Sequence, residues 1–190
     1  MFKYNIEKIA NTILYFTEKD VQHLGKTKLM KLMFFADKLH LEKYGRVIFF
    51  DEYYKYPRGP VANITLNIIN SINEVEKDDL EEYTNKFLKY LEVRTIKDNN
   101  DNITSFKPKV DFNKKFFSKS EIKILHTISN RFISHTKEEI SDESHNLKEY
   151  KKTKLMDKIQ EIEMIESKDM KEYYLFIQND NDSFNRNISA

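Results

Sequence analysis

Apolar residues near the start of the chain recur at the spacing of an α-helix. Ile6, Ile9, Ala10, Ile13 and Leu14 fall together on one helical face, while polar residues separate them. The pattern predicts an amphipathic helix over residues 4–17.

The next stretch, residues 27–44, is apolar around most of a helix. Such a segment is expected to be packed on most sides, so we predict the central helix of the domain here. Gly45 follows and can end the helix as a C-terminal cap. The apolar residues are Leu29, Met30, Leu32, Met33, Phe34, Phe35, Ala36, Leu39 and Leu41.

Residues 46–60 lose the helical repeat and become rich in β-branched and aromatic residues. This change predicts a short strand near Ile48, followed by a rigid loop in which Pro57 and Pro60 bracket Arg58 and Gly59. Apolar residues then resume helical spacing, which predicts a helix over residues 63–72.

Residues 90–97 and 103–110 flank the turn-rich run 98–102, so they are expected to form a hairpin. Helix starts are predicted where Ser, Thr or Asp stands three residues before Glu, the spacing of a capping box. Ser167 is expected to cap a last helix that carries Met170, Tyr173, Tyr174 and Phe176. The capping pairs are Asp78 with Glu81, Ser118 with Glu121, and Thr136 with Glu139.

These elements predict a mainly α fold with a small antiparallel β-sheet, in the α+β class: a compact helical domain with one hairpin. With 190 residues, the chain is expected to form a single domain over residues 1–178 and a polar C-terminal tail over residues 179–190.

Composition narrows the classes of function. The chain has no cysteine, which excludes disulfides, zinc fingers and a cysteine nucleophile. No apolar stretch approaches the roughly 20 residues of a membrane span, so we expect a cytoplasmic protein with no membrane partner.

The overall charge is nearly balanced, with 32 Lys and Arg against 31 Asp and Glu. A balanced charge gives no general attraction to nucleic acid. Two local basic patches nevertheless stand out, one formed by Lys26, Lys28, Lys31, Lys38, Lys43 and Arg46 and the other by Lys107, Lys109, Lys114, Lys115, Lys119 and Lys123. Lys28, Lys31 and Lys38 could contact phosphates, but a solvated helix face explains them equally.

Asp37, His40 and His145 are the residues that could hold a metal ion. Two imidazoles and one carboxylate form a ligand set that some metalloenzymes use. The alternative is a buried polar cluster in which Asp37 orients an imidazole. We favour this structural cluster, because no metal-binding sequence motif is present, and we expect no metal and no cofactor.

The segment after the central helix offers candidate partner-binding residues: Asp51, Tyr54, Tyr56 and Arg58. Tyrosine and arginine are enriched at interaction hot spots because each joins a large contact area to a directed polar group. The alternative is that Tyr53 and Tyr56 face inward as core aromatics, as alternation along a strand requires for half of the side chains.

One long stretch, residues 26–61, resembles the signature of the Panacea domain, which is found in SocA-like antitoxins. The signature consists of a lysine-rich apolar helix ending in Ala-Asp, a Tyr-Gly-Arg step, an Asp-x-Tyr strand and a Gly-Pro turn. Ser118 with Glu121, and then Ser144 with His145, fit a second part of the family pattern, whereas Tyr150 stands near the place where the family often has tryptophan. The first part is matched by Lys28, Leu29, Lys31, Leu32, Met33, Phe34, Phe35, Ala36, Asp37, Tyr44, Gly45, Arg46, Asp51, Tyr53, Gly59 and Pro60.

The resemblance implies a phage-associated or bacterial antitoxin, not an enzyme, whose partner is a cognate toxin neutralised by direct contact. In one member of the family, the domain also delivers its toxin to a ClpXP-type protease. The alternatives are a DNA-binding autoregulator of its own operon, suggested by the basic patches, and a metal-dependent hydrolase built on Asp37, His40 and His145.

Overall fold

The computed structural model describes residues 4–72, 80–98 and 101–188 of the chain. Over these ranges the fold is mainly helical, with two small antiparallel sheets of two strands each, which confirms the α+β class. The elements are α1 (Ile6–Glu18), α2 (Lys26–Tyr44), β1 (Tyr53–Tyr56), β2 (Gly59–Ala62), α3 (Asn63–Ser71), α4 (Glu81–Leu88), β3 (Leu91–Asp98), β4 (Asp101–Pro108), the 3-10 turn η1 (Lys114–Phe116), α5 (Lys119–Phe132), α6 (Lys137–His145), α7 (Lys148–Lys152), α8 (Glu161–Met164) and α9 (Lys168–Ile188).

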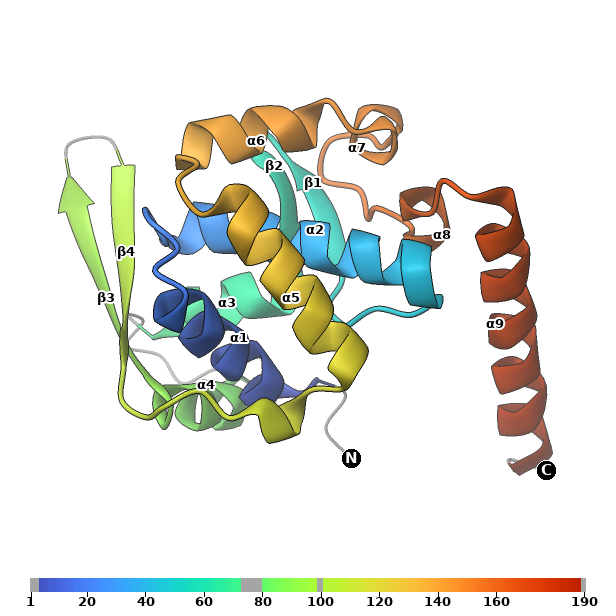
Figure 1. The fold of residues 1–190 in the computed structure, drawn as a ribbon, viewed down its shortest axis with the longest axis horizontal. Helices are drawn as coiled ribbons and strands as arrows, with labels where there is room; N and C mark the ends of the chain where they lie inside the picture. The colour runs from blue at the N-terminus through green and yellow to red at the C-terminus, as the bar shows by residue number, and fades with distance from the viewer. Residues whose placement is uncertain (1–3, 73–79, 99–100, 189–190) are drawn as a thin grey trace.

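Helix α2 runs through the middle of the molecule (Figure 1) and packs against α5, α6, α8 and β2. Its apolar side chains are buried around most of its axis, as predicted, and Leu39 is half-buried. Gly45 ends the helix in the left-handed conformation, with φ of 68°, and its amide donates to the carbonyl of Leu41. The central helix and its cap are therefore confirmed.

The strand predicted near Ile48 is wrong. Residues 46–50 form no strand, and β1 begins only at Tyr53. The Pro57–Pro60 loop is instead the tip of a second hairpin, in which Tyr56 pairs with Gly59 across a two-residue turn. The structure therefore has two hairpins, and they lie in separate sheets.

Asp37 provides the physical reason for the missing strand. Its buried carboxylate accepts hydrogen bonds from the amides of Ile48 (2.5 Å) and Phe49 (3.3 Å). These amides would have to donate to a neighbouring strand if residues 46–50 were part of a sheet. Asp37 on α2 therefore binds residues 46–50, which apolar composition alone assigns to a strand.

The predicted hairpin over residues 90–110 is confirmed by β3 and β4, which pair in register from Leu91–Pro108 to Asp98–Asp101. Both capping boxes that begin α5 and α6 are also present, with Ser118 and Thr136 as N-caps. Asp78 lies outside the described residues, and α4 begins at Glu81 with no side-chain cap from Leu80.

The segment after α7 contacts the first hairpin and then leads into α8 and α9. Residues 156–159 run along the free edge of β1, where the amide of Ile159 donates to the carbonyl of Tyr53 (2.7 Å) and the amide of Met156 to that of Lys55 (2.8 Å). Ser167 caps α9 as predicted, since its hydroxyl accepts from the amide of Met170.

Helix α9 stands at one side of the molecule (Figure 1). It continues to Ile188, so the polar residues 179–188 have helical backbone, and the domain boundary at 178 stays a prediction. None of the helices in the described ranges combines the length and the apolar character needed to cross a membrane.

Candidate functional site

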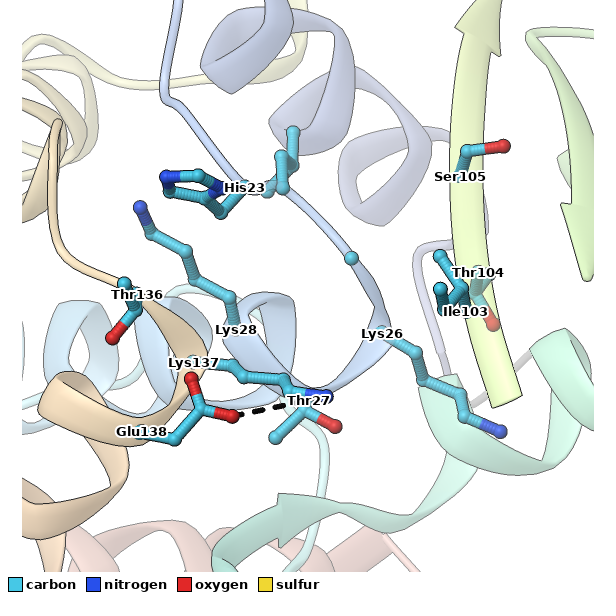
Figure 2. Close-up of a pocket in the computed structure, with 12 residues that line it drawn as sticks. His23, Lys26, Thr27, Lys28, Ile103, Thr104, Ser105, Thr136, Lys137 and Glu138 are labelled. Atoms are coloured by element: carbon cyan, nitrogen blue, oxygen red, sulfur yellow. Dashed lines mark ion pairs between the residues drawn. The ribbon is translucent and has the colours of Figure 1, made fainter. Parts of the chain in front are cut away.

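The N-terminal end of α2 is surrounded by three adjoining cavities, and Thr27 lines all of them. The first, of about 390 Å³, lies between the start of α2, the Ile103–Ser105 segment of β4 and the start of α6 (Figure 2). We call it the hairpin cavity. Its walls come from three segments, each separated from the next by 30 residues or more along the chain, so only the tertiary fold creates it.

The other two cavities lie on either side of the turn formed by Pro57 and Arg58. The His145 cavity, of about 310 Å³, is lined by this turn and by residues of α6, including Ser141 and His145. The Lys31 cavity, of about 260 Å³, is lined by the turn and by α2. We call the three cavities together the α2-end face.

Positive charge predominates on the α2-end face. Lys26, Arg58 and Lys137 line it, whereas its carboxylates are Glu138 and Asp142. The Lys137 ammonium lies 3.8 Å from the Glu138 carboxylate (Figure 2). Helices α2 and α6 both begin here, and the N-terminal end of a helix adds partial positive charge. The face is therefore suited to an acidic partner.

Lys28 has a structural role inside this region. Its side chain is buried, and its ammonium donates to the carbonyls of Gln22 (2.6 Å) and His135 (2.6 Å) and more weakly to that of Ile133 (3.4 Å). Since Ile133 and His135 follow α5 directly, Lys28 binds carbonyls that the helix end leaves without partners.

Lys31 crosses the interior to reach the first hairpin. It is 1% exposed, and its ammonium donates to the carbonyl of Pro60 (3.1 Å). Burial, with a further contribution from the Arg58 guanidinium, lowers the pKa of Lys31 to about 7.

The interpretation of Lys28, Lys31 and Lys38 as a solvated face is therefore wrong. All three side chains extend into the protein, and the Lys38 ammonium contacts the carboxylates of Glu149 (3.0 Å) and Glu166 (3.0 Å). Long apolar stems allow lysines to cross a core while their charged ends reach polar groups.

The four predicted partner-binding residues differ in position. Arg58 is exposed at the tip of the turn, and Tyr56 is half-buried beside it in the Lys31 cavity. Tyr54 is half-buried further along β1, where its hydroxyl lies 3.4 Å from a carboxylate oxygen of Glu52. Only Arg58 and Tyr56 therefore line the α2-end face.

Asp51 lies inside the protein. Its carboxylate accepts from the amide of Ile64 (2.9 Å) and from the amide (2.9 Å) and hydroxyl (2.7 Å) of Thr65. The pKa of Asp51 is raised above its ordinary value, because the effect of burial is larger than the opposite effect of these donors. Asp51 thus caps the start of α3 and holds it against β1, and a partner at the surface does not reach it.

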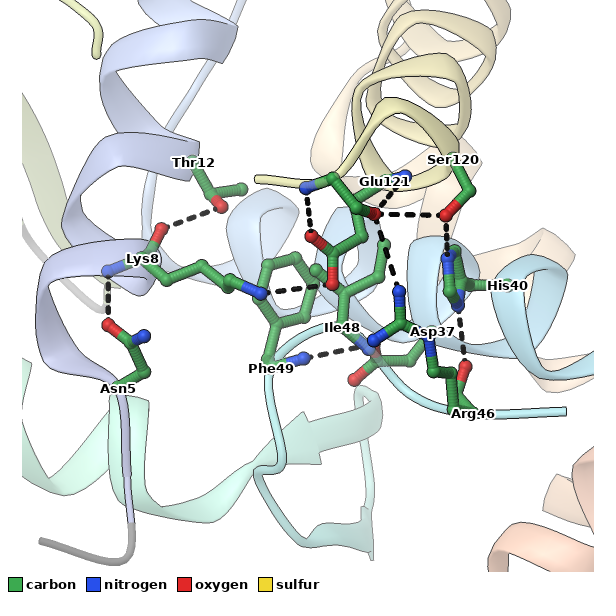
Figure 3. Close-up of polar contacts among 11 residues, drawn as sticks. Asn5, Lys8, Thr12, Asp37, His40, Arg46, Ile48, Phe49, Ser120 and Glu121 are labelled. Carbon is green, nitrogen blue, oxygen red and sulfur yellow. Dashed lines mark hydrogen bonds and ion pairs between the residues drawn. The ribbon is translucent and has the colours of Figure 1, made fainter. Parts of the chain in front are cut away.

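Asp37, His40 and His145 do not form one cluster, because each has its own surroundings. Asp37 accepts from the two amides described above and from the hydroxyl of Tyr53 (2.8 Å), and burial raises its pKa to about 7 against the effect of these donors. Figure 3 shows Asp37 and His40 near the end of α2 with their separate partners.

His40 and His145 contact different residues and do not contact each other. His40 joins the carbonyl of Arg46 (2.6 Å) to the hydroxyl of Ser120 (3.1 Å). His145 stacks on Tyr150, with ring centroids 4.9 Å apart, and its buried Nε2 atom has no hydrogen-bond partner. The described residues contain no group of three His, Cys, Asp or Glu side chains that could hold a metal ion.

The partner-binding role of Arg58 and Tyr56 stays a prediction, and the sequence did not predict the cavities or the places of Thr27, Lys31 and His145 on the α2-end face. The only local signal was the capping box at Thr136, which fixes where α6 begins and so where its first turn meets α2.

The comparison with protein families supplies the identity of the domain. The model of the SocA-like antitoxin family, which describes the Panacea domain, matches residues 29–151, more than half of the chain. None of the curated proteins and none of the solved structures that were compared matches the chain. The matched range contains α2 from Leu29 onward, both hairpins, α5 and α6, including the Pro57–Arg58 turn and His145. The chain therefore belongs to the family of SocA-like antitoxins that carry the Panacea domain.

Proposed function

We propose that this protein is an antitoxin that neutralises a toxin by direct contact through the α2-end face. The observation that carries the proposal is the basic, hollowed α2-end face: its walls from the Pro57–Arg58 turn, β4 and α6 lie inside the range matched by the antitoxin family, and the first turn of α2 lies just before that range. A surface with cavities and a protruding arginine offers both shape and directed charge to a partner protein.

The Pro57–Arg58 turn is held in a fixed position, which favours recognition. Its strands pair with each other, and the hydroxyl of Tyr150 donates to the carbonyl of Tyr56 (2.7 Å). The Lys55 ammonium lies 4.5 Å from the centre of the Tyr150 ring and donates to the carbonyl of Thr153 (2.8 Å). A preorganised turn loses little conformational entropy when a partner binds.

The test is neutralisation of a growth inhibitor, sought among the products of the genes that neighbour this one in its operon. Co-expression with the wild-type protein should restore growth, and Arg58→Ala should weaken the rescue. Arg46→Ala is the matched control, since Arg46 is exposed at the opposite end of α2 and should leave rescue intact. If no product of the operon forms a complex with the wild-type protein, the proposal is refuted.

The route of neutralisation is decided by the lifetime of the toxin. We propose direct inhibition, in which the toxin persists in an inactive complex. A toxin that disappears when the antitoxin is present, and persists when a ClpXP-type protease is removed, would identify the adaptor route instead.

A second candidate function is binding to the operon's own DNA, because the second basic patch is fully at the surface. All six of its lysines, along β4, η1 and the start of α5, are exposed. Binding through phosphates must weaken steeply as salt rises and must favour the operon's promoter over random DNA. Equal and negligible retention of both DNAs at low salt would exclude this function.

A further inference from the structure

The ammonium group of Lys31 is buried with fewer partners than it can use. Lys31 is 1% exposed, and within the described ranges its ammonium donates one hydrogen bond, to the carbonyl of Pro60 at 3.1 Å. An ammonium has three donors. No carboxylate among the described residues forms an ion pair with it. A buried charge without a counter-charge costs stability, so this lysine is poorly explained by folding alone.

The cavity beside Lys31 has the lining of a site for one amphipathic side chain. It measures about 260 Å³, with Lys26, Lys31 and Arg58 as cations and Met30, Val61 and Leu66 as apolar walls. Such a site accepts an aliphatic stem and a negatively charged end.

The hairpin turn and Lys31 are fitted closely together. A Cβ atom at Gly59 would lie 2.7 Å from Cε of Lys31 and 2.5 Å from Oγ of Ser144. The backbone of Gly59 therefore lies closer to the lysine than a residue with a Cβ atom would allow. On the other side of the same turn, the buried Nε2 of His145 has no partner. Two polar groups around one turn therefore remain incompletely satisfied.

We propose that the Lys31 cavity receives one acidic side chain, aspartate or glutamate, of the toxin, and that its carboxylate pairs with Lys31 and Arg58. This inference rests on the proposed function and specifies the chemistry of the contact.

The lining favours a carboxylate on a protein over a phosphate on a nucleic acid. The apolar walls match the methylene groups of an acidic side chain. The ammonium lies too deep for the phosphates of a rigid duplex.

Pairing with a carboxylate has a consequence for protons. In the free protein, burial and Arg58 hold the pKa of Lys31 at about 7, so most of the population is neutral at pH 8. The groups that face it are Arg58 from the turn, Lys26 from α2 and His145 from α6, and His145 is in turn near Asp142. A bound carboxylate stabilises the ammonium, so complex formation at pH 8 should take up a proton.

The experiment measures binding of the purified operon toxin by calorimetry at pH 8, in buffers that differ in ionisation enthalpy. The wild-type protein should take up close to one proton per complex. Lys31→Met, which keeps an unbranched side chain one atom shorter and removes the ammonium, should bind at least tenfold more weakly, take up no proton, and be as stable as the wild type or more so. His145→Gln should keep the proton uptake.

Lys38→Met is the matched control on the same helix. Lys38 is paired with Glu149 and Glu166, so its loss should lower stability and leave affinity and proton uptake unchanged. Toxin binding by the wild type without proton uptake, or with equal affinity for Lys31→Met, would overturn the inference while leaving the antitoxin function intact. No binding by the wild type would refute the function itself.

A free small anion would bring the same negative charge into the Lys31 cavity as a toxin side chain. Titration with small anions distinguishes these two ligands. Acetate and inorganic phosphate are titrated against the wild type and Lys31→Met while the melting temperature is followed. If either anion stabilises only the wild type at millimolar concentration and the toxin binds both proteins equally, the cavity holds a free anion, and the inference of a toxin side chain is overturned.

Discussion

The carboxyl group of Asp37 fixes the path of the chain between α2 and β1. It accepts hydrogen bonds from the amides of Ile48 and Phe49 and from the hydroxyl of Tyr53, all inside the core. Each donor would otherwise be buried without an acceptor, which costs about 1–3 kcal/mol per group. Because β1 carries the Pro57–Arg58 turn, this internal carboxylate determines where the turn stands on the surface.

Gly59 is the residue at which a minimal substitution should do the most harm. Its φ of 102° is unfavourable for any residue with a Cβ, and an added methyl group would collide with Oγ of Ser144 and Cε of Lys31. Gly59→Ala should therefore lower the free energy of unfolding by at least about 2 kcal/mol, as measured by urea denaturation.

Ser144→Ala removes one of the two clashing atoms and serves as the companion variant. The double variant should recover part of the loss, because strain at the backbone and at Lys31 would remain. A Gly59→Ala protein as stable as the wild type would show that the turn can move away from α2.

At the scale of elements, what could be predicted from the sequence is what local interactions determine. The capping boxes at Ser118 and Thr136 span three residues, and α2 could be recognised because its apolar residues cover most of a helical surface. The strand near Ile48 was wrongly predicted, because the competing acceptor, Asp37, lies eleven residues away and is brought close only by the fold.

The residues of the candidate site also differ in whether the local sequence predicts their position. Arg58 could be found from its place in a Pro- and Gly-bounded turn. Lys31 could not, because the sequence does not distinguish a lysine that reaches solvent from one that crosses the core to the carbonyl of Pro60. Cavities between α2, α6 and a hairpin also depend on long-range packing, for which the local pattern carries no signal.

Helices α1 and α5 are joined by an ion pair that should make stability depend on pH. The Lys8 ammonium lies 2.9 Å from the carboxylate of Glu121, which is 2% exposed and also accepts from the amide of Ser118 (Figure 3). Burial raises the pKa of Glu121, but the Ser118 amide and Lys8 outweigh this effect and leave it below its ordinary value.

Glu121→Gln should therefore lower the free energy of unfolding at pH 7 by about 1–3 kcal/mol, since Lys8 loses its counter-charge. The folded-state pKa of Glu121 is depressed, so the advantage of the wild type is complete above the ordinary pKa of glutamate and is lost as the pH falls through the depressed value. Urea denaturation of both proteins from pH 7 to pH 3 measures the difference. A difference that stays constant over this range would contradict the assignment.

At the scale of the whole molecule, α2 serves the core and the candidate site at once. Its middle is buried between α5, α6 and β2, while its first turn forms part of the α2-end face. The two regions are separated along one rigid helix, so folding and recognition should be separable by substitution.

Leu32→Ala and Arg58→Ala should have opposite effects. Leu32 is fully buried, and removal of a large buried side chain costs about 2–5 kcal/mol of folding stability. The Leu32→Ala protein that remains folded should bind the operon toxin as the wild type does, because its surface is unchanged. Arg58 is exposed at the turn, so Arg58→Ala should change stability by less than about 0.5 kcal/mol and weaken toxin binding by about 1–4 kcal/mol.

Both quantities are measured on each variant, stability by urea denaturation and affinity by calorimetry at a temperature where Leu32→Ala is still folded. Tyr54→Ala is a control within the same hairpin, since Tyr54 is half-buried, pairs with Val61 and lies outside the α2-end face, so its loss should lower stability somewhat and leave affinity unchanged. If Arg58→Ala unfolds the domain as strongly as Leu32→Ala does, the turn is part of the scaffold. The toxin would then have to contact another surface, and the exposed Tyr173 and Phe176 on α9, outside the range matched by the family, are the next residues to replace.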